Sequence, residues 1–479
     1  MANADRSRTG AVIVDPRDLE RLAGDISGQL IVPTHPDYDA ARGVWNAMID
    51  RRPAAIARCA TTADVAVVIG FAVRKEIPLA VRGGGHNVAG SATCDDGLVL
   101  DLSPMKSIQV DAGARRAKAG GGVVWGEFDA ETQKVGLATT GGLIPSTGIA
   151  GFTLGGGLGH LMRSHGLACD NLLSATVITA DGSRVRAGSD QNPDLLWALR
   201  GGGGNFGVVT EFEFQLHELA PTLLAGRLAH PLTRARDALR LYRDFTAAAP
   251  DSLIVYGSLS TGPDGDPRMG MRPVFNGPME EGRSILKSLR EFGPPVLDDI
   301  QPRSYVDVQR IVEPAFPPGR LNYWKANFVD NLSEELIEIL IEAIDRAPSR
   351  YSMIAIEPMG GAVARVSETA TAFEHRRHAY SLLILSGWVS DADTEANVAW
   401  ARQVWEQTRP LSSSAVYVNY LGAEGDERVR QAYGVNHARL SRLKRKYDPD
   451  NIFRLNQNIA PAPAEKDDSD TNRSSAVQN

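Results

Sequence analysis

A histidine that directly follows three glycines is the most reactive combination in this sequence. Gly83, Gly84 and Gly85 precede His86, and Arg82 stands just before them. Successive glycines let the backbone take positive φ angles and approach a ligand with no Cβ in the way. Such a loop forms an anion-binding concavity, to which an arginine adds a charge suited to phosphate. The segment therefore predicts a phosphate-containing ligand with an imidazole beside it.

A second glycine-dense segment spans residues 141–159. Glycine at this density weakens both helices and strands, because it adds chain entropy and offers no side chain to pack. We therefore expect this segment to wrap closely around a flat, extended cofactor.

Two charged residues lie in strands that are otherwise expected to be half-buried. Glu357 follows the predicted strand 352–356, and Lys325 lies in the segment Tyr323-Trp324-Lys325. An unpaired charge in such a place is costly, so it tends to be functional or paired. A Glu357–Lys325 pair that lowers the pKa of a tyrosine is one interpretation, and structural ion pairing alone is the other.

The composition excludes several classes of protein. The chain has 479 residues, 51 Lys and Arg against 58 Asp and Glu, and a net charge of −7, which gives no basic surface for nucleic acid or an anionic membrane. Its three cysteines are odd in number and widely spaced, which argues against disulfides or a cysteine metal site. The apolar patch 11–14 is too short for a signal peptide, and no apolar run reaches the roughly 20 residues that span a bilayer. We expect a cytoplasmic protein.

The elements that position these residues change in character near Pro221. Before it we expect a helix that starts at 61–64 and runs to Lys75, then a strand at 79–81 and a hairpin of 174–179 with 184–186. After it, blocks of strands and helices predict a second α+β domain with a large antiparallel sheet.

Two motifs imitate known sites. Gly202-x-Gly204-x-x-Gly207 matches the dinucleotide fingerprint, but it follows a predicted helix and opens a strand, the reverse of the required order. His375 and His378 resemble half of a metal site, but no third ligand accompanies them. We predict neither a Rossmann turn nor a metal.

Taken together, these features resemble the berberine-bridge-enzyme-like branch of the vanillyl-alcohol-oxidase flavoprotein superfamily. The resemblance covers residues 53–461. Its motifs are Arg82–Asn87, 141–159, Asp170-Asn171, Arg200–Gly207 and Tyr447–Ile459. The resemblance implies an α+β fold with a PCMH-type FAD-binding domain of two α+β subdomains, plus a substrate domain whose large antiparallel sheet is covered by helices. The implied divisions are 1–220 for FAD binding, 221–435 for substrate binding and 436–462 for a C-terminal return to the FAD domain. The tail at 463–479 is expected to be disordered because it is polar.

The resemblance assigns FAD as the cofactor, bonded covalently through His86. Many members add a second tether through a cysteine, but that position here is Ile144, so the chain is similar to the singly tethered bacterial members, such as 6-hydroxynicotine oxidase and the enterocin-pathway flavoenzyme. Thr147 falls where the family places a residue that influences reaction with oxygen. The other implied cofactor contacts are Arg82, Gly83, Gly84, Gly85, Asn87, Ser146, Gly148, Gly151, Gly156, Gly157, Gly159, Asn171, Gly207, Val208, Asn419, Asn456 and Asn458.

The family often uses a tyrosine of a Tyr-x-Asn-Tyr strand as the catalytic base, and Tyr417-Val418-Asn419-Tyr420 matches this pattern. In a strand, Tyr417 and Asn419 would point to one face and Tyr420 to the other. We favour Tyr420 as the base and keep Tyr417 in reserve, with Glu357 and Lys325 as supporting candidates.

The predicted function is an FAD-linked oxidase that removes a hydride from a C–H bond of a small or medium organic substrate, such as an alcohol, an amine or an intermediate of secondary metabolism. Molecular oxygen is the expected acceptor. The alternatives are an oxygenated-flavin monooxygenase of the N5-oxide type, a flavin dehydrogenase with another acceptor, and a non-catalytic flavin-binding protein. The expected partners are the substrate and oxygen, without nucleic acid or membrane, and a homodimer is an open alternative.

Overall fold

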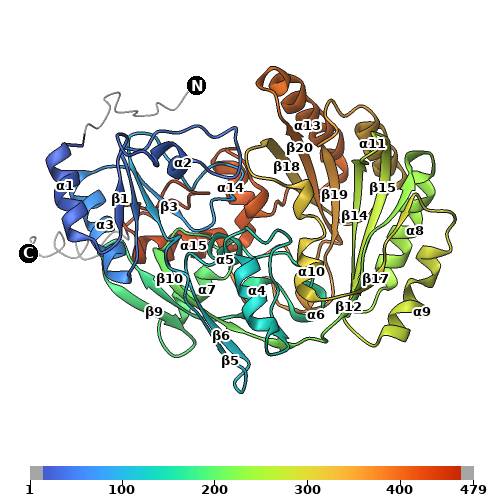
Figure 1. Cartoon of the computed structure of the whole chain (residues 1–479), viewed down its shortest axis with the longest axis horizontal. Coiled ribbons are helices and arrows are strands. Elements are labelled where there is room, and N and C mark those ends of the chain that lie inside the picture. Colours follow the sequence, from blue (N-terminus) through green and yellow to red (C-terminus); the bar gives the residue numbers. More distant parts are fainter. Residues whose placement is uncertain (1–13, 465–479) are drawn as a thin grey trace, which may run out of the picture.

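The structure is a computed structural model that describes residues 14–464. Figure 1 shows the N-terminal half on the left and a large sheet on the right, with the C-terminal helix α15 lying back among the elements of the left half. The predicted disordered tail at 463–479 lies almost entirely outside the described residues, as does most of the apolar patch 11–14.

The first sheet carries the glycine loop at the end of its edge strand β3. Its strands, in spatial order, are β1 (Gln29–Ile31), β2 (Ala55–Arg58), β4 (Leu98–Asp101) and β3 (Leu79–Arg82). Apolar residues of α1 (Pro16–Asp25) and α3 (Thr62–Lys75) pack against it. The predicted start of α3 is confirmed, because the Thr61 hydroxyl accepts from the backbone N–H of Asp64 while the Asp64 carboxylate accepts from that of Thr61.

The second sheet is antiparallel and supports the second glycine-dense segment. Its strands, in spatial order, are β5 (Ile108–Asp111), β6 (Arg116–Gly120), β10 (Val208–Gln215), β8 (Leu172–Ile178) and β9 (Arg184–Gly188). The β8–β9 pair confirms the predicted hairpin. The glycines from 201 to 207 lie between helix α7 (Pro193–Leu199) and β10, so the rejection of a Rossmann turn is also confirmed.

The large sheet is antiparallel throughout its pairings, in the order β16-β13-β15-β14-β19-β20-β18, with β12 paired to β15 and β17. Its strands are β12 (Leu223–Ala225), β13 (Leu228–Pro231), β14 (Leu253–Thr261), β15 (Pro267–Phe275), β16 (Leu297–Asp298), β17 (Gln301–Arg303), β18 (Leu321–Val329), β19 (Met353–Pro358) and β20 (Tyr380–Trp388). Successive side chains along a strand point to opposite faces, so each strand serves both sides of the sheet.

One face of the large sheet is covered by helices and the other faces the first half of the molecule. The covering helices are α8 (Ala235–Ala248), α9 (Met279–Arg290), α11 (Glu334–Asp345) and α13 (Thr394–Thr408). Val255, Ile356 and Ile384 pack into the helix-covered core, whereas Ala355 and Leu383 belong to the core on the other side. This arrangement confirms the predicted α+β fold class.

The C-terminal segment returns to the first half. The Lys444 ammonium donates to the carbonyl of Asn205 at 2.8 Å and to that of Phe453 at 2.9 Å, and it pairs with Asp448 at 2.6 Å. The remaining helices are α2 (Tyr38–Arg42), α4 (Trp125–Gln133), α5 (Ile149–Leu154), α6 (Met162–His165), α10 (Tyr305–Arg310), α12 (Ala362–Arg365), α14 (Asp426–Tyr433) and α15 (His437–Tyr447). The shorter 3-10 turns are η1 (Ala168–Asn171), η2 (Leu232–Arg234), η3 (Glu313–Ala315), η4 (Asp391–Asp393), η5 (Arg409–Leu411), η6 (Val418–Tyr420) and η7 (Gly434–Asn436). Among residues 14–464, no helix has the length and apolar character needed to cross a membrane.

Candidate active site

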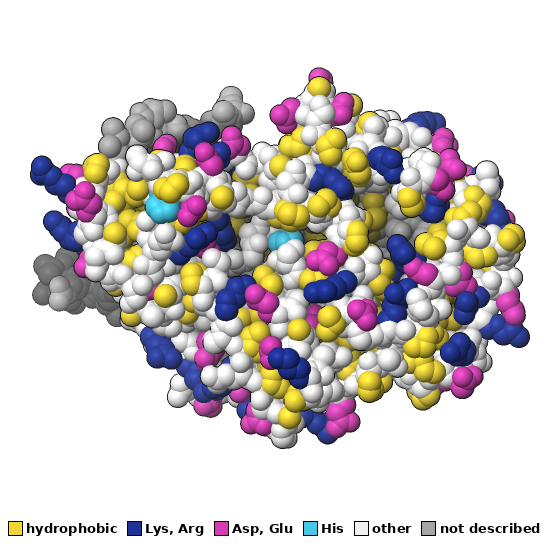
Figure 2. All heavy atoms as spheres, in the orientation of Figure 1, with side chains coloured by type: hydrophobic (Ala, Val, Ile, Leu, Met, Phe, Trp, Pro, Cys, Tyr) yellow, Lys and Arg dark blue, Asp and Glu magenta, His cyan; other side chains and the backbone are white. Residues whose placement is uncertain are grey.

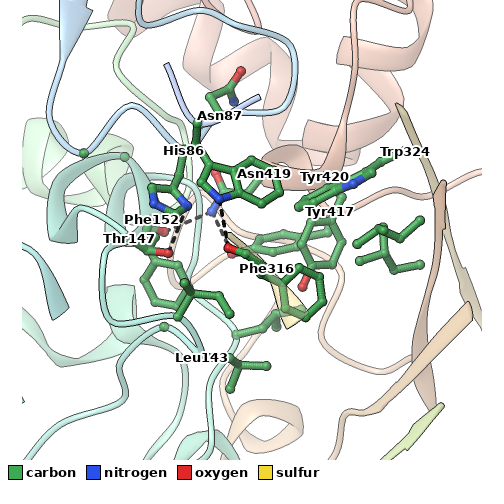
Figure 3. A pocket seen from close by; sticks show the side chains of 18 of the residues that line it. His86, Asn87, Leu143, Thr147, Phe152, Phe316, Trp324, Tyr417, Asn419 and Tyr420 are labelled. Atoms are coloured by element: carbon green, nitrogen blue, oxygen red, sulfur yellow. Dashed lines mark hydrogen bonds between the residues drawn. The ribbon is translucent and has the colours of Figure 1, made fainter. Parts of the chain in front are cut away.

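A cavity of about 640 Å³ lies between the glycine-rich loops and the uncovered face of the large sheet. Figure 2 shows this side of the molecule hollowed near its centre, and Figure 3 shows the interior, with His86 and Thr147 on one side and Tyr420 and Trp324 on the other. The cavity therefore has a glycine-rich wall and a sheet wall.

The glycine-rich wall is formed by two loops whose backbones touch. A Cβ added to Gly84 would lie 2.3 Å from the backbone nitrogen of Gly148, and one added to Gly148 would lie 2.4 Å from that of Gly84. Gly85 has a φ of +70°, in the left-handed region. Neither loop can carry larger residues at these contacts, so backbone atoms form this part of the lining.

His86 lies at the surface of this wall. Its Nε2 is 3.0 Å from the Ser146 hydroxyl, its Nδ1 is 3.4 Å from the Thr147 hydroxyl, and its ring stacks on Trp45 with centroids 5.4 Å apart. Desolvation lowers the pKa of His86 to about 4. The imidazole is therefore neutral near pH 7, with a free electron pair on one ring nitrogen.

Arg82 does not direct its guanidinium at the cavity. The side chain is buried and donates to the carbonyls of Ala41, of Ala92 at 3.2 Å and of Arg42 at 3.4 Å. The phosphate-binding role expected for Arg82 is thus replaced by bracing of the chain around the loop, because these carbonyls occupy its donors.

Tyr417, Asn419 and Tyr420 do not form the expected strand. Residues Val418–Tyr420 form the 3-10 turn η6, and the two tyrosine rings lie 4.8 Å apart, both lining the cavity. The Tyr417 hydroxyl accepts from the Gly157 N–H at 2.9 Å and from the Asn419 amide at 2.7 Å. The prediction that the tyrosines face opposite ways is wrong, because these bonds hold the segment against the glycine-rich segment.

Tyr420 forms the contact that sequence reasoning missed. Its hydroxyl donates to Oε1 of Glu357 at 2.8 Å, and Oε2 of Glu357 accepts no hydrogen bond from any described residue. Glu357 is 3% exposed and lines the cavity, and desolvation raises its pKa to about 7. Desolvation also raises the pKa of Tyr420 well above its usual range, and the nearby Glu357 adds to that shift.

The predicted Glu357–Lys325 pair is wrong, because the two side chains lie on opposite faces of the large sheet. Lys325 is paired in register with Ile384, which packs on the helix-covered side. Its ammonium lies 2.5 Å from the Glu424 carboxylate and 4.8 Å from the ring centre of Trp405 in α13. Glu357 faces the cavity instead.

The predicted cofactor residues divide into two groups. Those that line the cavity are Gly83, Gly84, Gly85, His86, Asn87, Thr147, Gly148, Gly151, Gly207, Val208, Asn419 and Asn456. Those placed elsewhere are Arg82, Ser146, Gly156, Gly157, Gly159, Asn171 and Asn458. Among the latter, Asn171 donates its amide to the carbonyls of His165 and Leu167 and so braces the loop that precedes β8.

Several lining residues had no sequence signal. Trp45, Phe316 and Trp324 surround the space in front of His86, and Tyr256 and Arg272 lie farther along the sheet wall. The ring centroids of Trp45 and Trp324 lie 5.8 Å apart, although the two residues are distant in sequence. The sequence predicted several of these strands, but not which of their side chains face the cavity.

Two family models match the chain. The FAD binding domain model matches residues 53–188, and the berberine and berberine-like model matches residues 416–460. The first match contains both glycine-rich loops, and the second contains Tyr417, Tyr420 and the C-terminal return.

Known proteins agree with this assignment. The chain is 34% identical over 460 residues to (R)-6-hydroxynicotine oxidase of Paenarthrobacter nicotinovorans, covering 91% of this chain and 97% of that protein. It is 32% identical over 419 residues to an FAD-linked oxidoreductase of Dictyostelium discoideum, covering 87% and 91%. The crystal structure of 6-hydroxy-D-nicotine oxidase from Arthrobacter nicotinovorans superposes with a TM-score of 0.86 at 32% identity, covering 91% of this chain and 98% of that one.

The fold and the cavity define an FAD-linked oxidoreductase. Within that class, the chain belongs to the berberine-bridge-enzyme-like family of PCMH-type flavoenzymes. The residues present fit FAD, since the glycine-rich wall leaves room for a flat ligand. Oδ1 of Asn456, a lining residue, is also shielded from solvent with no hydrogen-bond donor among the described residues.

Proposed function

We propose that this enzyme is an oxidase that removes a hydride from a C–H bond of a small or medium-sized organic substrate, with FAD attached through His86 and oxygen as the acceptor. When bound, FAD takes up the hydride and its two electrons. The observation that carries this proposal is the Glu357 carboxyl, which is buried beside the cavity with one oxygen unpartnered.

His86 supports the covalent attachment because it is the one histidine among the described lining residues. A ring with a pKa of about 4 keeps its nucleophilic electron pair at neutral pH. Stacking on Trp45 and the two hydroxyls of Ser146 and Thr147 fix the plane of the ring.

Glu357, rather than Tyr420, is the residue we propose as the general base. A base works best when its pKa lies near the operating pH, and the pKa of Glu357 is about 7. The pKa of Tyr420 is raised further from neutrality, so its phenol stays protonated. Tyr420 donates a hydrogen bond to Oε1 and thereby leaves Oε2 free to accept a proton from substrate. Tyr420 is thus a positioning residue for Glu357, and Tyr417 positions Asn419 and the glycine-rich segment.

The space between His86 and Glu357 favours an apolar substrate body. Trp324, Met353, Leu383 and Leu385 line it from the sheet wall. Thr147, a small residue beside His86, leaves space for oxygen on the side of the cavity opposite the sheet wall. The relatives named as oxidases support the same acceptor.

The described cysteines are free and buried, which supports the cytoplasm as the compartment.

Anaerobic bleaching of the yellow enzyme by a panel of secondary amines and alcohols, with (R)-6-hydroxynicotine as the first probe, tests this function. With an active probe, Glu357→Gln is expected to slow flavin reduction by about 10²- to 10⁴-fold, because the amide cannot accept the proton. Tyr420→Phe retains the carboxylate of Glu357, so its rate of flavin reduction is expected to fall less.

The same enzyme identifies the electron acceptor when air is admitted after reduction. Stoichiometric peroxide supports the oxidase. Slow reoxidation in air supports the dehydrogenase, and oxygen incorporation into product supports the monooxygenase. A panel that leaves the flavin oxidised throughout contradicts the proposal.

A further inference from the structure

The sheet wall of the cavity changes from apolar to cationic along its length. Trp324, Leu385 and Met353 lie in register across β18, β20 and β19 and form the apolar end. On the next strands, β14 and β15, Tyr256 lies directly opposite Arg272. Both line the cavity, so the wall ends in a phenol and a guanidinium.

Arg272 differs from the other two arginines that line the cavity. Arg227 pairs with Asp299 at 2.6 Å, and Arg268 pairs with Asp264 at 2.5 Å. Arg272 has no carboxylate within salt-bridge distance among residues 14–464, and its Nε is shielded from solvent without a hydrogen-bond acceptor. Its guanidinium lies over the ring of Tyr256, 4.8 Å from the centre.

The Tyr256 hydroxyl also lacks a hydrogen-bond partner within residues 14–464. Its side chain is buried, and its hydroxyl is shielded from solvent with no partner among the described residues. Burial raises the pKa of Tyr256 well above its usual range, so the hydroxyl is a donor. Leaving a buried donor or a desolvated cation without a partner costs free energy that a suitable acceptor would restore. Two adjacent unsatisfied donors therefore indicate that an anion completes this end of the cavity.

The anion is not supplied by Glu357. Glu357 is the one carboxylate among the described lining residues, and it lies beyond Tyr256, on β19. Arg272 is on β15, two strand spacings away, or about 10 Å. Tyr256 stands on the intervening strand β14, next to Glu357, so the phenol and the guanidinium form one continuous polar stretch of the wall beside the proposed base.

We propose that Arg272 and Tyr256 bind a carboxylate of the substrate, with Arg272 about 10 Å along the wall from the proposed base Glu357. This inference rests on the proposed function and narrows it to apolar or aromatic carboxylic acids of medium length. Arg272 supplies paired N–H donors suited to a carboxylate, and Tyr256 adds a neutral donor. The apolar side chains of Trp324, Leu385 and Met353, at the other end of the wall, favour an apolar substrate body.

Calorimetric titration of the flavin-loaded enzyme with two matched probes tests the proposal. The probes are 4-phenylbutyrate and its neutral analogue 4-phenylbutanamide. The wild-type enzyme is expected to bind the anion about tenfold to a hundredfold more tightly than the amide, as charge-assisted hydrogen bonds give. Arg272→Gln is expected to reduce that preference below about threefold, and Arg272→Lys to retain part of it.

Arg268→Gln is the matched control, because Arg268 lies on the same strand and the same face but is already neutralised by Asp264. It is expected to keep the preference within about twofold of wild type. Equal binding of the two probes by the wild-type enzyme, retention of the preference by Arg272→Gln, or its equal loss in Arg268→Gln would overturn the assignment. If Arg272→Gln does not fold, the Arg272→Lys and wild-type titrations decide the question.

These titrations involve no turnover, so they are independent of the oxidase proposal. A preference that disappears in Arg272→Gln, together with a Glu357→Gln variant that reduces flavin normally, would support the anion site and remove the proposed base. The converse pair of results would retain the base and remove the anion site.

Discussion

The two walls of the cavity are built by opposite means. The glycine-rich wall presents backbone from loops that touch at Gly84 and Gly148, with His86 as its reactive side chain. The sheet wall presents individual side chains from several strands, including Glu357 and Arg272. The first wall therefore recognises a ligand by its shape, and the second by the chemistry of individual groups.

This difference predicts where the protein tolerates change. A backbone surface has no side chain to exchange, so a substitution there adds atoms where the loops already meet. A substitution on the uncovered sheet face changes one contact and leaves the ladder of hydrogen bonds intact. Substitutions in the glycine-rich wall should therefore be poorly tolerated. Substitutions in the sheet wall should change substrate binding one residue at a time.

The largest expected effect is the loss of the proposed covalent bond between His86 and FAD on the glycine-rich wall. His86→Ala is expected to release all of its flavin when the protein is precipitated with acid, because no other described lining residue is a histidine. Absorbance of the redissolved pellet measures the retained flavin. His35→Ala, a histidine outside the cavity, should retain it as wild type does. Acid-stable flavin in His86→Ala would remove the covalent assignment.

A second test adds one methyl group to the same wall. Gly84→Ala is expected to lower the flavin content at least about tenfold and to destabilise the fold by about 1–3 kcal/mol, because the new Cβ meets the backbone of Gly148. Thermal unfolding and flavin absorbance provide the two measurements. Gly151→Ala is the control for stability, since a Cβ there meets no protein atom within 4 Å. Equal melting temperatures for the two variants would contradict the close backbone contact of Gly84 with Gly148.

On the sheet wall, the ionisation of Glu357 is expected to control the rate. Its pKa is raised to about 7, so the reactive carboxylate is lost as the pH falls through that value. The rate of flavin reduction should fall about tenfold per pH unit below 7 and level off above it. Arg272 lowers this pKa, so Arg272→Gln should move the midpoint to higher pH. A flat profile between pH 5 and pH 9 would exclude Glu357 as the base.

Folding stability should follow the opposite trend at this residue. The pKa of Glu357 is higher in the folded protein than its ordinary value of 4.5, so the folded state holds the proton more tightly. Stability should therefore fall as the pH rises from about 4.5 through 7, and Glu357→Gln should remove that contribution.

The smallest expected effect on catalysis comes from Lys325, on the far side of the same sheet. Lys325→Met should leave the rate of flavin reduction within about threefold of wild type, since its partner is Glu424 and not Glu357. The melting temperature should still fall, because the half-buried carboxylate of Glu424 loses one of its two cationic partners and keeps only Arg428. A rate loss of a hundredfold would show that the two faces of the sheet are functionally coupled.

The sequence predicted the glycine-rich wall better than the sheet wall. Local rules suffice where the signal is local, as in the Thr61–Asp64 capping box, the β8–β9 hairpin and the order of helix, glycine turn and strand before Val208. The α+β class and the large antiparallel sheet followed from similar patterns.

Which side chains form the sheet wall depends on the strand register, because a shift of one residue moves every side chain of a strand to the opposite face. Lys325 and Glu357 both lie in predicted strands, but only the pairing of β18, β20 and β19 shows that they face opposite ways. The contact of Tyr420 with Glu357 joins residues 63 positions apart across a 3-10 turn, and nothing in the local sequence indicates it.

The position of the C-terminal segment also sets an order of events during biosynthesis. Asn456 and Gln457 line the cavity, and they are held there by bonds to Gly204 and to the carbonyls of Leu421 and Gly422. The glycine loop is translated early, but the cavity it faces is closed by residues that are translated much later. A ribosome-stalled chain that ends before Lys444 would lack these residues, so His86 would lie in an incomplete enclosure.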